Sequence, residues 1–250
     1  MPRRLGFATR LSFCRFAPMM CLMNTSRRKE LFIGVGFVVL VVALMIFAGV
    51  ASSGKSSTKT AFTGGQTTPI TASDHIKGNP SATVSVVEYG DFQCPACAQY
   101  EPVIQQLISE YGDRIAFVFR HFPLYQAHPN AEIASHAAEA AALQGKFWEM
   151  HDLLYAKQSE WSTASMRSIV RDHFSVYASS LGMDVAKFES DIRSEAVVQK
   201  VNADAASGNA ARVNHTPTFF INLVEIKNPT NYDAFKSVID AALASSTSAQ

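Results

Sequence analysis

The side chains best suited to chemistry in this sequence are two cysteines separated by two residues, in Cys94-Pro95-Ala96-Cys97. Thiolates attack disulfides and bind metals, so this spacing suits dithiol–disulfide exchange or half of a zinc site. A disulfide between these cysteines closes a loop of only four residues, which removes little entropy from the unfolded chain. We therefore interpret the pair as a redox centre and not as a structural cross-link.

The sequence predicts different roles for the two thiols. Cys94 directly precedes Pro95, a residue favoured at the first position of a helix, and apolar residues then recur at helical spacing up to Gly112. Unpaired N–H groups and the helix dipole favour an anion at a helix N-terminus. Cys94 is thus predicted to be the nucleophile. Cys97, one turn later, is predicted to face inward as the resolving thiol.

Two predicted strands flank this helix. Residues 82–89 (ATVSVVEY) and 115–120 (IAFVFR) are short and rich in β-branched and aromatic residues, and residues 90–93 form a turn into Cys94. A strand, a helix and a second strand predict a βαβ unit with a parallel sheet. Functional groups of such sheets gather at the carboxyl ends of the strands. Cys94 follows that end of the first strand.

Glu88 lies near the end of the first predicted strand. Strand alternation places it with Val84 and Val86, on a face that we expect to be buried. A buried carboxyl group beneath the dithiol could accept and return the proton of Cys97. A solvated glutamate on an edge strand fits the alternation equally well.

The remainder of the chain predicts a helical segment and then a return to the sheet. Residues 128–211 are helical in pattern and too long for a loop, residues 218–226 have strand character, and residues 232–243 form an amphipathic helix.

The bond between Thr216 and Pro217 precedes the later strand. It is trans by default, because few X-Pro bonds are cis.

The histidines give no clear metal site. Most of the seven are scattered without the i, i+4 pairing of zinc peptidases, and zinc at the cysteine pair would need further ligands from distant parts of the chain. His121 follows the second strand, and His215 lies two residues before Pro217, so these two are the candidates. Trp148 and Trp161 are expected in the core. We predict no cofactor and no resident metal.

The N-terminal part predicts a membrane anchor. Leu31–Val50 has no charged residue, and about 20 apolar residues span a bilayer. The first 30 residues are strongly basic, which places them in the cytoplasm and the rest of the chain outside. Cys14 and Cys21 then cannot pair with the exported cysteines. A cleaved signal peptide is the alternative, and a start at Met23 would give a compact charged segment before the apolar run.

The whole chain has 250 residues, of which 48% are hydrophobic, and a net charge of +1. This composition suits one domain with appendages and gives no electrostatic field for nucleic acid. The predicted plan is a cytoplasmic segment 1–30, an anchor 31–50, a flexible linker 51–73 rich in Ser, Thr and Gly, a domain 74–245 with a helical insertion at about 128–211, and a tail 246–250.

Taken together, these residues resemble the DsbA-like thiol:disulfide oxidoreductases, a branch of the thioredoxin-fold superfamily with an inserted helical domain. The resemblance covers nearly all of residues 74–245. It rests on the segments DHIKGNPSATVSVVEYGDFQCPACAQYEP, FRHFPL, HPNAEIASHAAEAA, QGKFWEMHDLLY and HTPTFF.

The resemblance implies more than the residues alone. Pro217 would be a cis-proline facing the dithiol, and the Thr216 backbone would pair with an extended substrate segment. Glu88 would be the buried acid of the family, and residues 128–211 would form a helical cap. The sequence differs from the strongly oxidising members at Ala96, where they carry histidine. The hairpin after Asn222 also lacks a glycine that is common there.

We therefore expect an α/β thioredoxin-like fold that exchanges disulfides with exported cysteine-containing proteins. The expected reaction is disulfide formation, with a membrane redox partner that recycles the dithiol. A disulfide reductase or isomerase is an alternative direction of the same chemistry. A copper or zinc metallochaperone using Cys94, Cys97 and His121 is an alternative of another class, as is a tethered chaperone without redox turnover.

Overall fold

The computed structural model describes residues 62–247. The predicted anchor, Cys14, Cys21 and Met23 lie outside the described residues. Between residues 62 and 247, none of the helices combines the length and apolar character that crossing a bilayer requires. The helices and strands follow one another in the order β1 (Phe62–Gln66), β2 (His75–Gly78), β3 (Val84–Gly90), α2 (Pro95–Tyr111), η1 (Gly112–Arg114), β4 (Ile115–His121), α3 (Ala131–Ala142), α4 (Phe147–Ala156), α5 (Gln158–Trp161), η2 (Val170–Phe174), α6 (Ser175–Ser180), α7 (Val185–Asp191), α8 (Glu195–Ala210), β5 (Thr218–Ile221), β6 (Val224–Ile226) and α9 (Tyr232–Thr247).

The described strands form one mixed sheet in the order β1-β6-β5-β3-β4-β2. Strands β3 and β4 are parallel and are joined by α2, so the predicted βαβ unit is confirmed. β5 joins the other side of β3 as an antiparallel neighbour. β3 is therefore a central strand, and groups at its carboxyl end lie in the middle of the sheet edge.

Alternation along β3 divides its side chains between two apolar clusters. Val84 and Val86 face a cluster that contains residues of α2 and α9, whereas Val87 and Tyr89 face a smaller cluster on the other side. Each strand of the pair β3 and β4 is buried along nearly its whole length, as expected where both faces of a parallel pair are covered. By alternation, Glu88 is directed towards the face that packs against α2.

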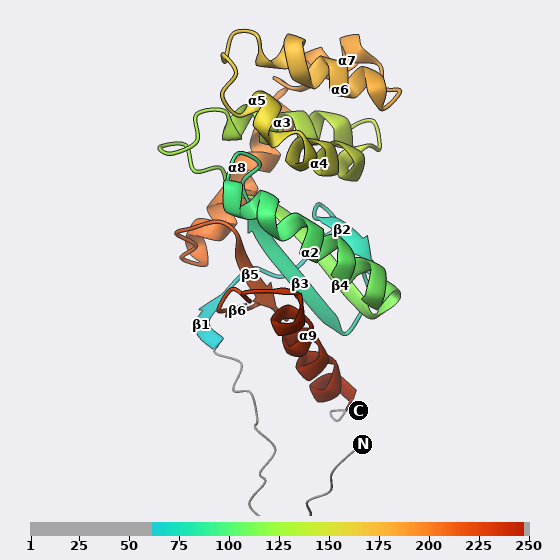
Figure 1. Ribbon diagram of the computed structural model, residues 1–250, viewed down its shortest axis with the longest axis vertical. Helices are drawn as coiled ribbons and strands as arrows, with labels where there is room; N and C mark the ends of the chain where they lie inside the picture. Colours follow the sequence, from blue (N-terminus) through green and yellow to red (C-terminus); the bar gives the residue numbers. More distant parts are fainter. Residues whose placement is uncertain (1–61, 248–250) are drawn as a thin grey trace, which may run out of the picture. The chain divides into compact units, whose positions relative to one another are not determined.

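The expected helical insertion is confirmed, since every described helix from α3 to α8 lies between β4 and β5 in the chain. Figure 1 shows α3 to α7 grouped beyond the end of the sheet where β3 leads into α2. Trp161 is fully buried there and donates its indole N–H to the Leu154 carbonyl at 2.9 Å. The C-terminal helix extends to Thr247, so the predicted tail begins later than residue 246.

The hairpin between β5 and β6 turns without glycine. Asn222 and Leu223 both have positive φ, at 48° and 68°, as a two-residue type I′ turn requires. Asparagine tolerates this region because its amide bonds locally, and here its Oδ1 accepts the Ser85 N–H at 2.9 Å. The Asn222 N–H in turn donates to the Ser85 carbonyl at 2.9 Å. The hairpin is thus anchored to β3.

The predicted flexible linker 51–73 needs a correction in its later part. Phe62–Gln66 forms β1, which pairs with β6 in antiparallel orientation. Low hydrophobicity hid this strand, because an edge strand is held by backbone hydrogen bonds and needs little apolar surface. Residues 51–61 lie outside the described part.

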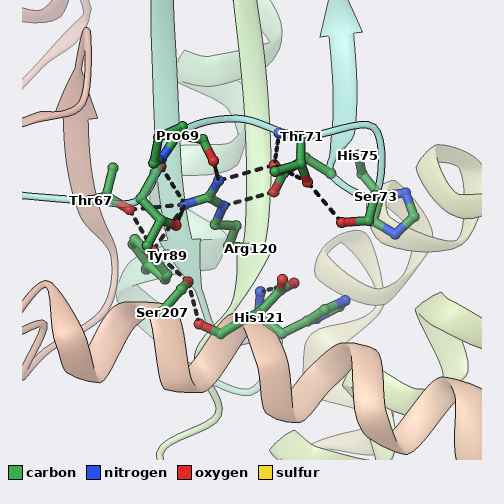
Figure 2. A network of polar contacts seen from close by, with 12 residues as sticks. Thr67, Pro69, Thr71, Ser73, His75, Tyr89, Arg120, His121 and Ser207 are labelled. Carbon is green, nitrogen blue, oxygen red and sulfur yellow. Dashed lines mark hydrogen bonds and ion pairs between the residues drawn. The ribbon is translucent and has the colours of Figure 1, made fainter.

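Arg120 fixes the segment that follows β1 (Figure 2). Its guanidinium donates to both carboxylate oxygens of Asp74, at 2.7 and 3.0 Å, and to the Thr67 hydroxyl at 2.9 Å. It also donates to the carbonyls of Thr68 and Pro69 at 3.1 and 3.0 Å. A planar donor fork suits such a set of acceptors. The connection between β1 and β2 is therefore held by one buried side chain of β4.

Candidate functional site

The dithiol lies at the start of α2. Cys94 is the N-cap residue, with an extended backbone (φ −71°, ψ 120°), and Pro95 follows at the first position of the helix. The Cys94 N–H donates to the Asp91 carbonyl at 3.0 Å, which closes the turn after β3. Both thiols are free, and Cys94 is 6% exposed against 1% for Cys97. The more accessible sulfur is thus the one at the helix terminus.

The surroundings shift the two thiols in opposite directions. The pKa of Cys94 is lowered to about 5, first by a hydrogen bond with the Cys97 thiol, with further help from the N–H groups of Cys97 and Ala96, and against the effect of burial. The pKa of Cys97 is raised well above its usual value by burial, by its bond to Cys94 and by the charge of Glu88. At neutral pH the pair holds one thiolate and one thiol.

Thr216 and Pro217 lie against the dithiol, and the peptide bond between them is cis. In its protonated form, the Cys94 thiol donates to the Thr216 carbonyl at 3.4 Å. The Thr216 hydroxyl is buried and has no hydrogen-bond partner among the described residues. Sequence reasoning alone favoured a trans bond; only the family resemblance implied the cis form.

Glu88 is 2% exposed and lies on the central strand β3, so the alternative of a solvated edge-strand glutamate was wrong. Its pKa is raised well above the usual value by burial and by the charges of Glu101 and Cys94. The carboxyl group is therefore neutral over a wider pH range than a free glutamate. A neutral acid that interacts with both thiols can exchange protons with them.

Two glutamines, which the sequence did not single out, hold the turn between β3 and α2. Gln158 of the helical insertion donates to the Phe92 and Cys94 carbonyls, at 2.7 and 3.0 Å. Gln93 donates to the Ser162 carbonyl at 2.7 Å and accepts the Asn130 N–H at 2.6 Å. The redox centre is thus bonded directly to the inserted helices. Nothing in the spacing of these polar residues predicts such contacts.

Asp91 is a third residue that sequence reasoning missed. It is fully buried, and its carboxylate accepts the Leu124 N–H at 2.9 Å and bonds His128 Nδ1 at 2.7 Å. Its other oxygen accepts the Gln93 N–H at 2.7 Å. This carboxylate joins the turn before Cys94 to the loop after β4. The pattern Asp-x-x-Cys before a helix was the available clue.

The two candidate histidines do not join the dithiol in a metal site. His121 Nε2 bonds Glu139 at 2.7 Å, and His75 Nε2 bonds the same carboxylate oxygen at 2.7 Å. Among the described side chains, the groups of His, Cys, Asp and Glu close enough to share an ion contain no cysteine. His215 is exposed and bonds its neighbour Asn214 at 2.9 Å. Among the described residues, Cys94, Cys97 and His121 thus do not come together as a three-ligand group.

Comparison with known proteins decides the family. The family model described as thioredoxin matches residues 71–241. The chain belongs to the thioredoxin family. Among solved structures, the domain is similar to oxidised BdbD from Bacillus subtilis, with 24% identity, a TM-score of 0.62, and coverage of 73% of this chain and 98% of that one. It is also similar to α-DsbA1 from Wolbachia pipientis, with 19% identity, a TM-score of 0.62, and coverage of 72% and 94%.

These likenesses establish a thioredoxin-like α/β fold with a DsbA-type helical insertion. Family membership and the dithiol at the start of α2 make the chain a DsbA-like thiol:disulfide oxidoreductase. Cys94 and Cys97, the pair singled out from the sequence, form the Cys-x-x-Cys of this domain at the start of α2.

The curated relatives are much longer proteins. The chain is 39% identical over 172 residues to the Na⁺/H⁺ antiporter NhaA 3 of Salinispora tropica, covering 69% of this chain and 25% of that protein. It is 41% identical over 151 residues to the Na⁺/H⁺ antiporter NhaA 1 of Mycolicibacterium gilvum, covering 60% and 23%. The chain thus spans about a quarter of the length of these relatives. The similarity therefore covers only the part of each relative that corresponds to the domain of this chain.

Proposed function

We propose that this protein forms disulfides in exported cysteine-containing proteins, with Cys94 as the nucleophile and Cys97 as the resolving thiol. A substrate thiolate attacks the Cys94–Cys97 disulfide at Cys94 and displaces Cys97. A second substrate thiolate then attacks the mixed disulfide, releases the oxidised substrate and leaves Cys94 as a thiolate. A membrane redox partner would reoxidise the dithiol.

One observation carries the direction of this proposal: the pKa of Cys94 is lowered to about 5. A stabilised thiolate favours the reduced dithiol over the disulfide, so the disulfide form readily oxidises a substrate. Ala96 does not remove this effect, because its backbone N–H is one of the groups that lower the pKa. The low pKa also makes Cys94 a good leaving group when the second substrate thiolate attacks.

The binding site for the substrate is proposed at Thr216 and Pro217. Residues 216–217 lie beside Cys94 at the start of β5, and the Cys94 thiol contacts the Thr216 carbonyl. The backbone of Thr216 would pair with an extended substrate segment, as in strand addition to a sheet edge. Glu88 is proposed as the buried group that accepts and returns the proton of Cys97.

The location is also part of the proposal. Leu31–Val50 would anchor the chain as a single span, with residues 1–30 in the cytoplasm and the oxidoreductase domain outside. A shortened linker, ending before β1, would join them. The relatives named as Na⁺/H⁺ antiporters support a membrane setting for such domains.

The test uses the variant Cys97→Ser in the full chain, expressed in its own host or a close relative of it. Without a resolving thiol, mixed disulfides between Cys94 and its natural partners should accumulate, and a reductant should release them. The matched control is the double variant Cys94→Ser, Cys97→Ser, which should yield none. Absence of thiol-sensitive adducts with Cys97→Ser would reject the proposal, and the identity of trapped proteins would name substrates and recycling partner.

The direction of disulfide exchange, oxidation or reduction of the substrate, is tested by a separate measurement. The purified domain is equilibrated with glutathione buffers of known ratio, and the fraction of disulfide is quantified. A reduction potential above that of glutathione is expected for an enzyme that forms disulfides. Since a tenfold change in the equilibrium constant corresponds to about 30 mV for two electrons, a potential well below that of glutathione would instead support a reductase.

A further inference from the structure

Chemistry at Cys97 moves a proton that must cross a closed interior. Cys97 is 1% exposed and Glu88 is 2% exposed, so neither exchanges protons with bulk water directly. Each time the Cys94–Cys97 disulfide forms, the Cys97 thiol loses a proton; each time the disulfide opens, the Cys97 thiolate regains one. The proton therefore needs a route between this buried pair and the surface in either direction of exchange.

A cluster of titratable side chains lies on the side of Glu88 towards α2 and α4. Glu101 of α2 is 7% exposed and interacts electrostatically with Glu88. Glu101, His151 and Asp152 each offer one side-chain oxygen or nitrogen atom, and these three atoms all lie within 4.8 Å of one another. Asp152 has 36% of its side chain exposed and is paired with Lys77 at 3.3 Å. The cluster thus begins at a buried carboxyl group and ends at the surface.

His151 is the central member of the cluster. Its Nδ1 bonds Asp152 Oδ1 at 2.9 Å, while its Nε2 is buried without a hydrogen-bond partner among the described residues. An imidazole can accept a proton at one nitrogen and release one from the other. Aromatic rings hold this imidazole in place, with centroids 4.7 to 6.0 Å away: Phe92, Phe119, Phe147, Trp148 and Tyr155.

A purely structural role explains the position of His151 poorly. A buried nitrogen without a partner costs stability, and an apolar side chain would fill an aromatic pocket without that cost. The Tyr155 hydroxyl beside it is also buried without a partner among the described residues, and it interacts electrostatically with Cys97, Glu88 and Glu101. Two neighbouring rings, those of His151 and Tyr155, therefore each carry a buried polar atom without a partner among the described residues.

We infer that His151 carries the proton of Cys97 between the buried Glu88–Glu101 pair and the exposed carboxylate of Asp152. The inference rests on the proposed function and assigns His151 and Asp152 as proton-transfer residues of that site. The charged groups that face His151 are Glu101 from α2, Asp152 from α4 and, beyond Asp152, Lys77 from β2.

The step can be written for a mixed disulfide at Cys94. The Cys97 sulfur forms a bond to the Cys94 sulfur, and the bond between Cys94 and the bound thiol breaks. The departing thiolate takes the electron pair of the broken bond. Glu88 takes the Cys97 proton on one carboxyl oxygen and releases its own proton from the other to Glu101, and one proton leaves through His151 and Asp152 to water. Opening of the disulfide uses the same route inwards.

The test follows this step with 5,5′-dithiobis(2-nitrobenzoate) by stopped flow, on the reduced full-length protein in which Cys14 and Cys21 are replaced by serine, so that Cys94 and Cys97 are its two thiols. Cys94 releases one nitrothiobenzoate in a fast phase that depends on reagent concentration. Cys97 then releases the second in a phase that does not, and the rate of this second phase is measured against pH. His151→Asn and Asp152→Asn are compared with His136→Asn, which replaces a buried histidine of α3 outside the cluster.

We expect the second phase to slow by about tenfold or more in His151→Asn, since positioned acid–base groups contribute about 10²–10⁴-fold. Asp152→Asn should slow it less, and His136→Asn should leave it unchanged. Added imidazole should accelerate the slow variants in proportion to its concentration and leave the wild type unaffected. Mere damage to the fold would give no such acceleration.

Two results would overturn the inference. One is a second phase within about twofold of wild type in both His151→Asn and Asp152→Asn at every pH measured. The other is a slow His151→Asn variant that imidazole does not accelerate while Asp152→Asn stays normal. A wild type that releases only one nitrothiobenzoate would instead reject the proposed pairing of Cys94 and Cys97, so the two failures are distinguishable.

Discussion

Cys94 and Cys97 are suited to different roles in disulfide exchange because they occupy different positions at the start of one helix. Cys94 is the N-cap of α2, where free N–H groups favour a thiolate, while Cys97 lies one turn on, against buried Glu88. The hydrogen bond between the two sulfurs stabilises the charge on Cys94 and keeps the proton on Cys97. Each thiol therefore sets the protonation of the other.

Removing that hydrogen bond should raise the pKa of Cys94. Cys97→Ala removes the hydrogen bond that does most to lower the pKa of Cys94, and we expect the midpoint to move up from about 5. Cys97→Ser keeps an O–H donor and should stay closer to the wild type. The rate of alkylation by iodoacetamide, measured against pH, reports the thiolate. An unchanged midpoint in Cys97→Ala would show that the backbone N–H groups alone hold the charge.

Glu88 should make the reduced protein less stable as the pH rises. Its pKa is raised in the fold above the ordinary 4.5, so the native state binds more protons than the unfolded state at pH values above about 4.5. The free energy of unfolding therefore falls with increasing pH until the carboxyl group ionises in the native state. Glu88→Gln removes this loss, and the variant should exceed the wild type in stability by a margin that grows with pH.

The measurement is urea unfolding of the reduced protein at a series of pH values. Glu149→Gln is the matched control, because Glu149 is exposed and its pKa is lowered by Lys146. Its effect should be small and of opposite sign. If the difference in stability between Glu88→Gln and the wild type does not change with pH, the sign assigned to the carboxyl group is wrong.

The turn between β3 and α2 depends on an element that lies far away in the sequence. Gln158 of α5 satisfies two carbonyls of this turn, including that of Cys94 itself. Local propensity accounts for Pro95 at the first helical position, but the direction in which the helix points is fixed from the inserted helices. The insertion is therefore part of the redox site and not only a cover over it.

Gln158→Leu should destabilise the protein by about 1–3 kcal/mol, the usual cost of leaving buried acceptors unpaired. Gln144→Leu is the matched control, since Gln144 also makes two bonds to one neighbour, Asp184, but in an exposed position. Its cost should be less than about 1 kcal/mol. Urea denaturation gives both values, and amide exchange should accelerate at Phe92–Cys94 only in Gln158→Leu. Equal effects would show that the turn holds itself.

An element can be predicted from the sequence when local patterns stabilise it, and cannot when distant contacts do. The helix after Cys94 and the strands β3 and β4 are set by local patterns: Pro95 starts the helix, Gly112 ends it with φ of 49°, and β-branched runs form the strands. β1 has no such pattern, since it is held by its partner β6, while the side chain of Arg120 holds the segment that follows it. The same distinction applies to the site, where Cys94 was predictable and Gln158 was not.

The chain as a whole joins a redox domain to a predicted membrane segment through residues 51–61. Because β1 and the Arg120 contacts order the domain from residue 62 onwards, the linker proposed from composition is shorter than first predicted. In the proposed topology, a linker whose reach is about 5 to 6 Å times the square root of its length would keep the dithiol within reach of a recycling partner in the same membrane.

The proposed topology predicts which cysteines a membrane-impermeant maleimide can reach. In intact cells stripped of outer envelope layers, the reagent should label the reduced protein at Cys94 and should label Cys14 and Cys21 only after the membrane is opened, because the basic segment 1–30 is predicted inside. Cys94→Ser should lose most of the external label, since Cys97 is more deeply buried and its pKa is raised. External protease should release the domain by cutting within residues 51–61. Label on Cys14 or Cys21 in intact cells would reverse the orientation, and a full-length chain in the soluble fraction would reject the anchor.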